Sequence, residues 1–213
     1  SIGVVSVILG ATGHGKSTLL FTGARAAAAQ DTLSIVYSFE DPSKFWAQRA
    51  IAQETGIPTE AIARRRHLES QMRRLAGARV AAKTRTEIIL PAAGMTVDDI
   101  ARDVQARRMR DRLAHGRRRQ CAVWVDYVQV IKLLVERNGN REQGIAHAMD
   151  RLAWLAQGCG SADPGDECAV IAASQVKQRV VDEKRPPRMD DGADSFSITK
   201  VCKFMLGINR PSK

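Results

Sequence analysis

The sequence predicts an α/β fold in which a mostly parallel central sheet carries helices on both faces. Three observations lead to this fold class. Short apolar runs alternate along the chain with longer helix-forming stretches, which is the pattern of strand–helix–strand units. The first apolar run ends in a glycine-rich segment that opens a helix. The length of 213 residues suits one sizeable α/β domain and is short for two.

Each predicted strand is a run rich in Val, Ile and other apolar residues, as expected for strands buried on both faces of a parallel sheet. The predicted strands cover 4–9, 33–39, 87–90, 121–131, 169–175 and 201–208. The fourth run is strongly apolar and carries a single acid, Asp126.

Helices are predicted between these runs. Pro42 and Pro58 stand where proline favours the start of a helix. Thr96 is expected to cap a helix that ends before Gly116. The predicted helices cover 16–29, 42–55, 58–74, 97–115 and 140–158. Residues 75–86 show no clear pattern, and a polar loop is predicted between the last two strands.

Charge is a prominent feature of the composition. Lysine and arginine number 33 against 23 acidic residues, which gives a formal net charge of +10. Arginine clusters at 64–66, 73–74, 107–112 and 117–119 carry the excess. Clustered cations favour a polyanionic partner such as nucleic acid, because each phosphate contact releases counterions. Solvated helix faces are the alternative. Aromatic residues make up 5%, which disfavours a base-stacking platform.

The sequence also excludes several classes of protein. No apolar run reaches the roughly 18 residues of a membrane span, and the N-terminus lacks a secretion signal. The four cysteines form no CxxC pair and no metal-ligand spacing with the four histidines. They are interpreted as reduced thiols. We therefore expect a cytoplasmic protein without a membrane association.

The segment Gly10–Thr18, GATGHGKST, matches the phosphate-binding pattern GxxxxGK[ST]. In such a loop the backbone N–H groups surround the β-phosphate, the lysine reaches the β- and γ-phosphates, and the hydroxyl ligates Mg²⁺. Because the segment follows a strand and opens a helix, we predict a nucleotide site rather than a fortuitous glycine turn. His14 is expected to have no catalytic role. The predicted nucleotide-binding residues are Gly10, Ala11, Thr12, Gly13, His14, Gly15, Lys16, Ser17 and Thr18.

Three polar residues end predicted strands, where ligands bind in open α/β sheets. Asp126 would be costly to bury alone, which favours a role at Mg²⁺, through water or Ser17, over capping the next loop. Glu40 is placed to polarise the water that attacks a γ-phosphate, or is a helix N-terminal charge. Gln175 is placed to bond the γ-phosphate or that water, or is an ordinary polar strand end.

The motifs GATGHGKST, YSFEDP, VWVDYVQVI and SQVKQRV…KRPPRMDDGAD come in the order and spacing of one family. They resemble the RecA-like ATPase domain of DnaB-type replicative helicases. DYVQ is similar to the family's Asp-Tyr-Leu-Gln, and SQ…KRP is the second specific part. The resemblance covers nearly the whole chain and implies one RecA-like P-loop domain over residues 1–213.

The resemblance implies a hexameric ring that hydrolyses ATP with Mg²⁺ between subunits, moves along single-stranded DNA and unwinds duplex. It implies primase and a helicase loader as further partners. Carried over by motif, the catalytic residues are Glu40 as base, Lys16, and Gln175 as γ-phosphate sensor. Ser17 and Asp126 are the metal residues.

Further roles and departures come from the same resemblance. Arg49 falls where the family has an arginine near the nucleotide. The loop at 190–197 matches the family's central-channel DNA loop, but its sequence DDGADSFS is acidic and lacks the usual Arg-Glu pair. DNA contacts are therefore expected from backbone N–H groups or from neighbouring cations. The predicted DNA-binding residues are Lys184, Arg185, Arg188, Asp190, Gly192 and Ser195.

The chain stops before the family's strand that carries an arginine finger acting in trans, so the domain is expected to be incomplete at its C-terminal end. Two other functions stay open. One is a RecA- or RadA-like recombination ATPase that forms filaments on DNA. The other is a catalytically silent loader or regulator that binds ATP as a switch.

Overall fold

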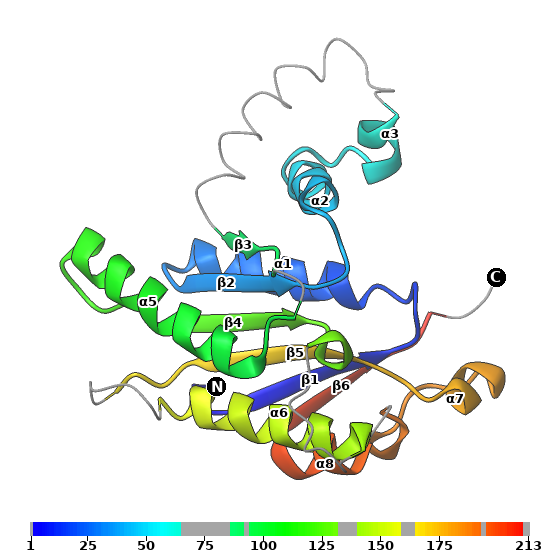
Figure 1. The fold of residues 1–213 in the computed structure, drawn as a ribbon. Helices are drawn as coiled ribbons and strands as arrows, with labels where there is room; N and C mark the ends of the chain where they lie inside the picture. The colour runs from blue at the N-terminus through cyan, green and yellow to red at the C-terminus, as the bar shows by residue number, and fades with distance from the viewer. Residues whose placement is uncertain are drawn as a thin grey trace.

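A computed structural model describes residues 2–64, 86–91, 94–131, 140–158, 165–192 and 195–210. Within these ranges six parallel strands form one sheet in the order β3-β2-β4-β5-β1-β6 (Figure 1). This confirms the predicted α/β class. The strands are β1 (Val5–Gly10), β2 (Leu33–Ser38), β3 (Glu87–Ile89), β4 (Cys121–Asp126), β5 (Ala169–Gln175) and β6 (Phe204–Ile208).

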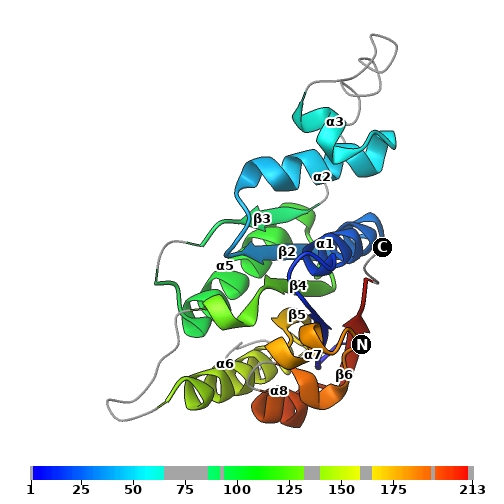
Figure 2. The ribbon, with the colours of Figure 1, turned by 90° about the vertical axis from the view of Figure 1, so that its right-hand side faces the viewer.

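Helices cover both faces of the sheet, as expected (Figures 1 and 2). One face carries α5 (Val97–His115), α6 (Arg141–Ala156) and α8 (Ser195–Val201). The other face carries α1 (Lys16–Ala29) and α2 (Ser43–Thr55). In both views α2 and the short α3 (Thr59–Ala63) project beyond the β2–β3 side of the sheet. None of the helices in the described ranges is both long enough and apolar enough to span a bilayer.

Aromatic packing joins α1 to α2 and to the sheet. Phe21 and Trp46 are fully buried and meet edge to face, with ring centroids 4.9 Å apart. A Cβ on Gly23 would lie 2.9 Å from the Trp124 ring, so only glycine allows α1 to approach β4 this closely. The first helix is thereby held against the strand that ends at Asp126.

Local capping signals define the helices on the other face. Thr96 accepts a hydrogen bond from the Asp99 N–H, and the Asp99 side chain accepts one from Thr96 in return, which confirms the predicted N-cap. Asn140 and Gln143 form the same reciprocal pair at the start of α6. Gly116 ends α5 at φ 64°, where a residue with a side chain would be strained.

The boundary predicted for the fourth strand is wrong. The strand predicted over 121–131 ends at Asp126, and the chain turns into the 3₁₀ helix η1 (Val128–Val130). The apolar side chains of Val128 and Ile131 are buried, but these residues lie in the turn that follows β4 and do not extend the sheet. The helix predicted over 58–74 begins in α3, and its residues 65–74 lie outside the described ranges.

The predicted polar loop before the last strand also proves to be structured. It contains α7 (Gln178–Asp182), the 3₁₀ helix η2 (Met189–Asp191) and α8, so β6 begins at Phe204 rather than at 201. These helices are too short to show hydrophobic periodicity, and α8 is anchored by the fully buried Ile198. The sequence therefore offered no pattern from which to predict them.

The register of the sheet brings the strand ends to one edge. Gly10 of β1 pairs with Gln175 of β5, and Ser38 of β2 pairs with Asp126 of β4. Because all strands are parallel, their carboxyl ends and the segments that follow lie at the same edge.

Candidate nucleotide site

The glycine-rich loop joins β1 to α1 and is closed on itself. The Ala11 carbonyl accepts a hydrogen bond from the His14 N–H at 3.2 Å and one from Lys16 Nζ at 3.0 Å. Gly13 and Gly15 adopt φ of 80° and 95°, values that strain any residue with a side chain. Gly15 occupies the N-cap position of α1 and offers no capping side chain, so the first N–H groups of the helix suit an anion.

Lys16 lies among carboxylates at the start of α1. The lysine is 7% exposed, and burial lowers its pKa, while the nearby Asp126 and Glu40 raise it in part. A buried cation beside a helix N-terminus provides a strongly positive environment for phosphate oxygens. The predicted phosphate role of Lys16 and its loop is thus supported by their geometry.

Asp126 has the chemistry of a metal ligand. It is 1% exposed, and burial raises its pKa, while the Ser17 hydroxyl lies close enough to lower that pKa in part. Neither carboxylate oxygen has a hydrogen-bond partner of standard geometry among the described residues. Buried carboxylates without such partners are costly unless a cation binds them. A carboxylate and a hydroxyl are oxygen donors that suit Mg²⁺, so the residues fit this ion.

A cavity of about 230 Å³ brings most of the predicted catalytic and nucleotide-binding residues together. Glu40 follows β2 and Gln175 ends β5, so the cavity is formed where separate strands finish. The Phe39 N–H donates to the Asp126 carbonyl at 2.9 Å and so aligns the Glu40 segment with the end of β4. The lining residues are Thr12, Gly13, Gly15, Lys16, Ser17, Thr18, Glu40, Asp41, Arg49 and Gln175.

Arg49 reaches this cavity from α2. Its Nη1 forms an ion pair with Asp41 Oδ2 at 2.5 Å, and its guanidinium lies 5.0 Å from the centroid of the Trp46 ring. The part of Asp41 in holding Arg49 is missed by sequence reasoning. The adjacent acids in YSFEDP were the one available signal.

Tyr127 is a second residue that sequence reasoning missed. It follows Asp126 in the chain. Burial raises the pKa of the Tyr127 hydroxyl, and the neighbouring Glu40 carboxylate raises it further, while the Gln175 side chain lies close enough to the hydroxyl to lower that pKa in part. The peptide bond between Asp126 and Tyr127 is cis. No pattern in the apolar run 121–131 distinguishes this tyrosine from a core residue.

A second cavity, of about 350 Å³, adjoins the same loop. His14 lines it, and His14 Nδ1 accepts a hydrogen bond from the Arg210 N–H at 3.3 Å. The loop histidine therefore connects the phosphate loop to the segment after β6. The lining residues are Ala11, His14, Val176, Val180, Val181, Lys184, Arg185, Pro187, Asn209 and Arg210.

The predicted DNA-binding segment after Gln175 is folded back on itself. Val176 forms a β-bridge with Gly192, and the Lys177 N–H donates to the Asp191 carbonyl at 2.8 Å. Asp191 is fully buried, and its carboxylate is bonded by Arg185 at both terminal guanidinium nitrogens. The root of the segment thus lies directly beside the predicted sensor.

The predicted DNA-binding cations differ in their surroundings. Lys184 is exposed at the end of α7, with φ of 51°, and Arg188 is exposed beside η2. Arg185 is engaged by Asp191 and also by Glu183. Asp190 is exposed, and Ser195 is the first residue of α8. Residues 193–194 of the predicted DNA loop lie outside the described ranges.

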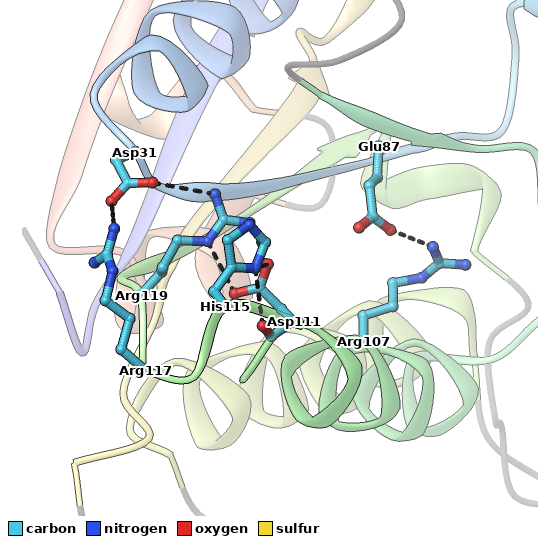
Figure 3. Close-up of polar contacts among 7 residues, drawn as sticks. All are labelled: Asp31, Glu87, Arg107, Asp111, His115, Arg117 and Arg119. Carbon is cyan, nitrogen blue, oxygen red and sulfur yellow. Dashed lines mark hydrogen bonds and ion pairs between the residues drawn. The ribbon is translucent and has the colours of Figure 1, made fainter. Parts of the chain in front are cut away.

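The arginine clusters at 107–112 and 117–119 lie elsewhere. Asp31 precedes β2, and Arg117 and Arg119 precede β4, so this cluster lies at the amino ends of the strands, opposite the cavity. Figure 3 shows Arg107, Arg117 and Arg119 directed at acids of α5 and of other elements. The pairs are Arg107–Glu87, Arg107–Asp103, Arg108–Asp166, Arg117–Asp31, Arg118–Asp166, Arg119–Asp31 and Arg119–Asp111. The arginines at 65–66 and 73–74 lie outside the described ranges.

The fold and site together define a P-loop protein of the RecA-like class. A family model described as "DnaB-like helicase C terminal domain" matches residues 3–213. The chain therefore belongs to the DnaB-like helicase C-terminal domain family, as the sequence motifs predicted.

Solved structures agree on the fold. One, described as an "ATPase Domain", superposes with a TM-score of 0.82 at 20% identity, over 96% of this chain and 69% of that one. "The Structure Of A DnaB-Like Replicative Helicase And Its Interactions With Primase" superposes with a TM-score of 0.80 at 18% identity, over 95% of this chain and 46% of that one. The chain thus spans less than half of the second protein. No curated protein matches the sequence.

Proposed function

We propose that this chain is the ATP-hydrolysing motor of a hexameric replicative helicase, which translocates on single-stranded DNA and unwinds duplex. The main observation is the gathering of Lys16, Ser17, Glu40 and Gln175 around one cavity. Asp126, with its buried carboxylate, supports the same interpretation. Family membership adds the helicase context, in which ATP hydrolysis drives movement.

The phosphates of ATP are bound by the loop and by the start of α1. Backbone N–H groups from Gly13 to Ser17 and the Lys16 ammonium neutralise their charge. Ser17 and Asp126 would hold Mg²⁺, which supplies further charge neutralisation when bound. The second cavity, beside His14 and Arg210, provides apolar and polar surface for the adenine ring of ATP.

Hydrolysis requires a base near the γ-phosphate. Glu40 lines the cavity and accepts a proton from the attacking water, which it also orients. Gln175, at the end of β5, contacts the γ-phosphate or that water and responds to its loss. Arg49 adds positive charge from α2.

Partners and assembly follow from the same proposal. One structurally similar DnaB-like replicative helicase is described with its interactions with primase, and we propose primase and a helicase loader as partners here. The site of action is the cytoplasm of a bacterium, or of the host in the case of a phage protein.

Replacement of the base tests the chemistry. Glu40→Gln in the complete protein should lower the DNA-stimulated kcat by about 10²–10⁴ and leave ATP binding intact, because the amide keeps the shape but cannot accept the proton. Phosphate release and binding of a fluorescent ATP analogue measure the two effects. Glu60→Gln, an exposed change on α3, is the matched control. Turnover at the wild-type level in Glu40→Gln would refute the assignment.

Electron microscopy distinguishes the other functions. With a non-hydrolysable ATP analogue and single-stranded DNA, the complete protein should form closed six-membered rings. Open filaments would favour a recombination ATPase. Undetectable ATP turnover in the presence of DNA would favour a silent loader or regulator.

A further inference from the structure

Strands β4 and β5 separate at the edge that holds the nucleotide site. Their backbone pairing ends at Val125 and Ala172. Beyond this point Asp126 pairs only with β2, and Gln175 pairs only with β1. The metal carboxylate and the sensor amide therefore lie on strand ends that no backbone pairing joins.

One buried side chain crosses this separation. Gln129 Nε2 donates to Ser174 Oγ at 2.7 Å, and the two residues are 8% and 0% exposed. The Ser174 hydroxyl in turn donates to the Gln175 carbonyl at 3.4 Å. The contact thus joins η1, which follows Asp126, to the residue immediately before the sensor.

The position of Gln129 is itself restrained. Its carbonyl accepts a hydrogen bond from Arg141 Nη2 at 3.2 Å, at the start of α6. The Gln175 side chain also lies near the hydroxyl of Tyr127, the residue that follows Asp126. The buried hydrogen bond from Gln129 to Ser174 is the contact that joins the end of β4 to the sensor segment.

We propose that Gln129 is a positioning residue for ATP hydrolysis, which acts through Ser174 to set the sensor Gln175 relative to the Asp126–Ser17 metal site. The contacts that carry this proposal join Gln129 to Ser174 and to Arg141, so its role is one of positioning and not of catalysis. The inference rests on the proposed function and assigns a role to the glutamine of the DYVQ motif. Small displacements of an aligned group have large effects on rate, which is why a buried hydrogen bond at this separation matters.

A double-mutant cycle in the complete protein tests the proposal. Gln129→Met keeps the side-chain length and removes the donor, and Ser174→Ala removes the acceptor. Each change should lower the DNA-stimulated kcat roughly tenfold and leave KM for ATP within about twofold. The double variant should match either single variant within about twofold, because both remove the same contact.

Ser34→Ala is the matched control. Ser34 is 2% exposed and donates to the Ala24 carbonyl at 2.8 Å, but it lies near the amino end of β2. The Ser34→Ala variant should lower Tm by an amount similar to that of Ser174→Ala, but its kcat should equal that of the wild type. Melting curves of all variants confirm that the folded proteins are compared.

The outcomes separate the two proposals. A wild-type protein without ATP turnover overturns the proposed function and this inference with it. Wild-type turnover with normal kcat in both single variants overturns only the inference. The same holds if the two losses multiply in the double variant, or if Ser34→Ala loses as much activity as Ser174→Ala.

Discussion

At the scale of single residues, Asp126 places chemistry in conflict with stability. It sits at the end of a fully buried strand, and no described residue gives either of its oxygens a hydrogen bond of standard geometry. An apolar strand end would fold more favourably. The carboxylate is retained, we infer, because Mg²⁺ binding offsets the cost of burying it.

Asp126→Asn should therefore stabilise the nucleotide-free protein. We expect its free energy of unfolding to rise by about 1–3 kcal/mol, since the variant removes a buried charge that no described residue meets with a hydrogen bond of standard geometry. Each kcal/mol corresponds to roughly 2–4 °C in Tm for a domain of this size. Thermal melts without and with Mg²⁺-ATP measure both effects, and the stabilisation by Mg²⁺-ATP should be reduced in the variant. A lower Tm for the nucleotide-free variant would contradict this account.

The pH dependence of that difference has a defined sign. The pKa of Asp126 is raised in the folded protein, so its ionisation costs stability. The cost is absent below the ordinary carboxyl pKa of about 4, grows as the pH rises from there, and is complete above the folded-state pKa. The Tm gap between Asp126→Asn and wild type should be wider at neutral pH than below about pH 4.

At the scale of elements, the segment after β5 is a compact unit between the sensor and β6. Its root is closed by the Val176–Gly192 bridge, and its interior holds the buried Asp191 carboxylate. Arg185 hydrogen bonds hold the pKa of Asp191 well below its usual range. Because the unit starts at Gln175, the proposed function predicts that a change at the γ-phosphate reaches this segment first.

Two adjacent cations in this unit should behave differently. Lys184→Ala should weaken binding to single-stranded DNA, because the exposed lysine can contact phosphate, and should leave Tm unchanged. The salt slope, which is the slope of log K for DNA binding against log salt concentration, should become less steep by about one. Arg185→Met should lower Tm, because it leaves the Asp191 carboxylate buried without its guanidinium. DNA titrations at several salt concentrations and thermal melts separate the two. If Lys184→Ala and Arg185→Met reduced the salt slope equally, the proposed difference between a DNA-binding lysine and a structural arginine would be contradicted.

The pH response of Arg185→Met checks the same ion pair. Asp191 has a depressed pKa, so its stabilising contribution is present above the ordinary carboxyl pKa and is lost as the pH falls below it. The Tm gap between Arg185→Met and wild type should therefore narrow below about pH 4.

At the scale of the whole molecule, charge is divided between two edges of the sheet. The carboxyl edge holds the phosphate loop and the segment after β5. The amino edge holds Arg117 and Arg119, which are paired with acids (Figure 3). The net charge of +10 is thus not a measure of the number of phosphate contacts.

Arg119→Met tests this division. Arg119 is bonded to Asp111, whose side chain is 8% exposed, so its loss should lower the free energy of unfolding by roughly 1–3 kcal/mol. The salt slope of binding to single-stranded DNA should stay at the wild-type value, in contrast to Lys184→Ala. Chemical denaturation and DNA titration give the two quantities. A reduced salt slope for Arg119→Met would indicate that the arginines at the amino edge contact DNA.

The sequence by itself determined the approximate positions of the strands, the glycine-rich loop and the polar residues at three strand ends, because these are local patterns. The phosphate-binding motif consists of nine consecutive residues, Gly10–Thr18, and buried strands are visible as apolar runs. Strand pairing in the structure places Gly10 beside Gln175 and Ser38 beside Asp126. What no local pattern contains is which charged or polar groups find each other across the chain.

Only the tertiary structure decided those pairings. Gln129 and Ser174 are 45 residues apart, and Arg117 and Asp31 are 86 apart, so neither contact follows from periodicity or composition. The same holds for the short helices found in place of the predicted polar loop, since α8 depends on the burial of Ile198. An arginine has one identity in sequence, but its role depends on whether a carboxylate or open solvent faces it. Packing of the tertiary structure determines which of the two faces the arginine, because it brings distant segments together at the two edges of the sheet.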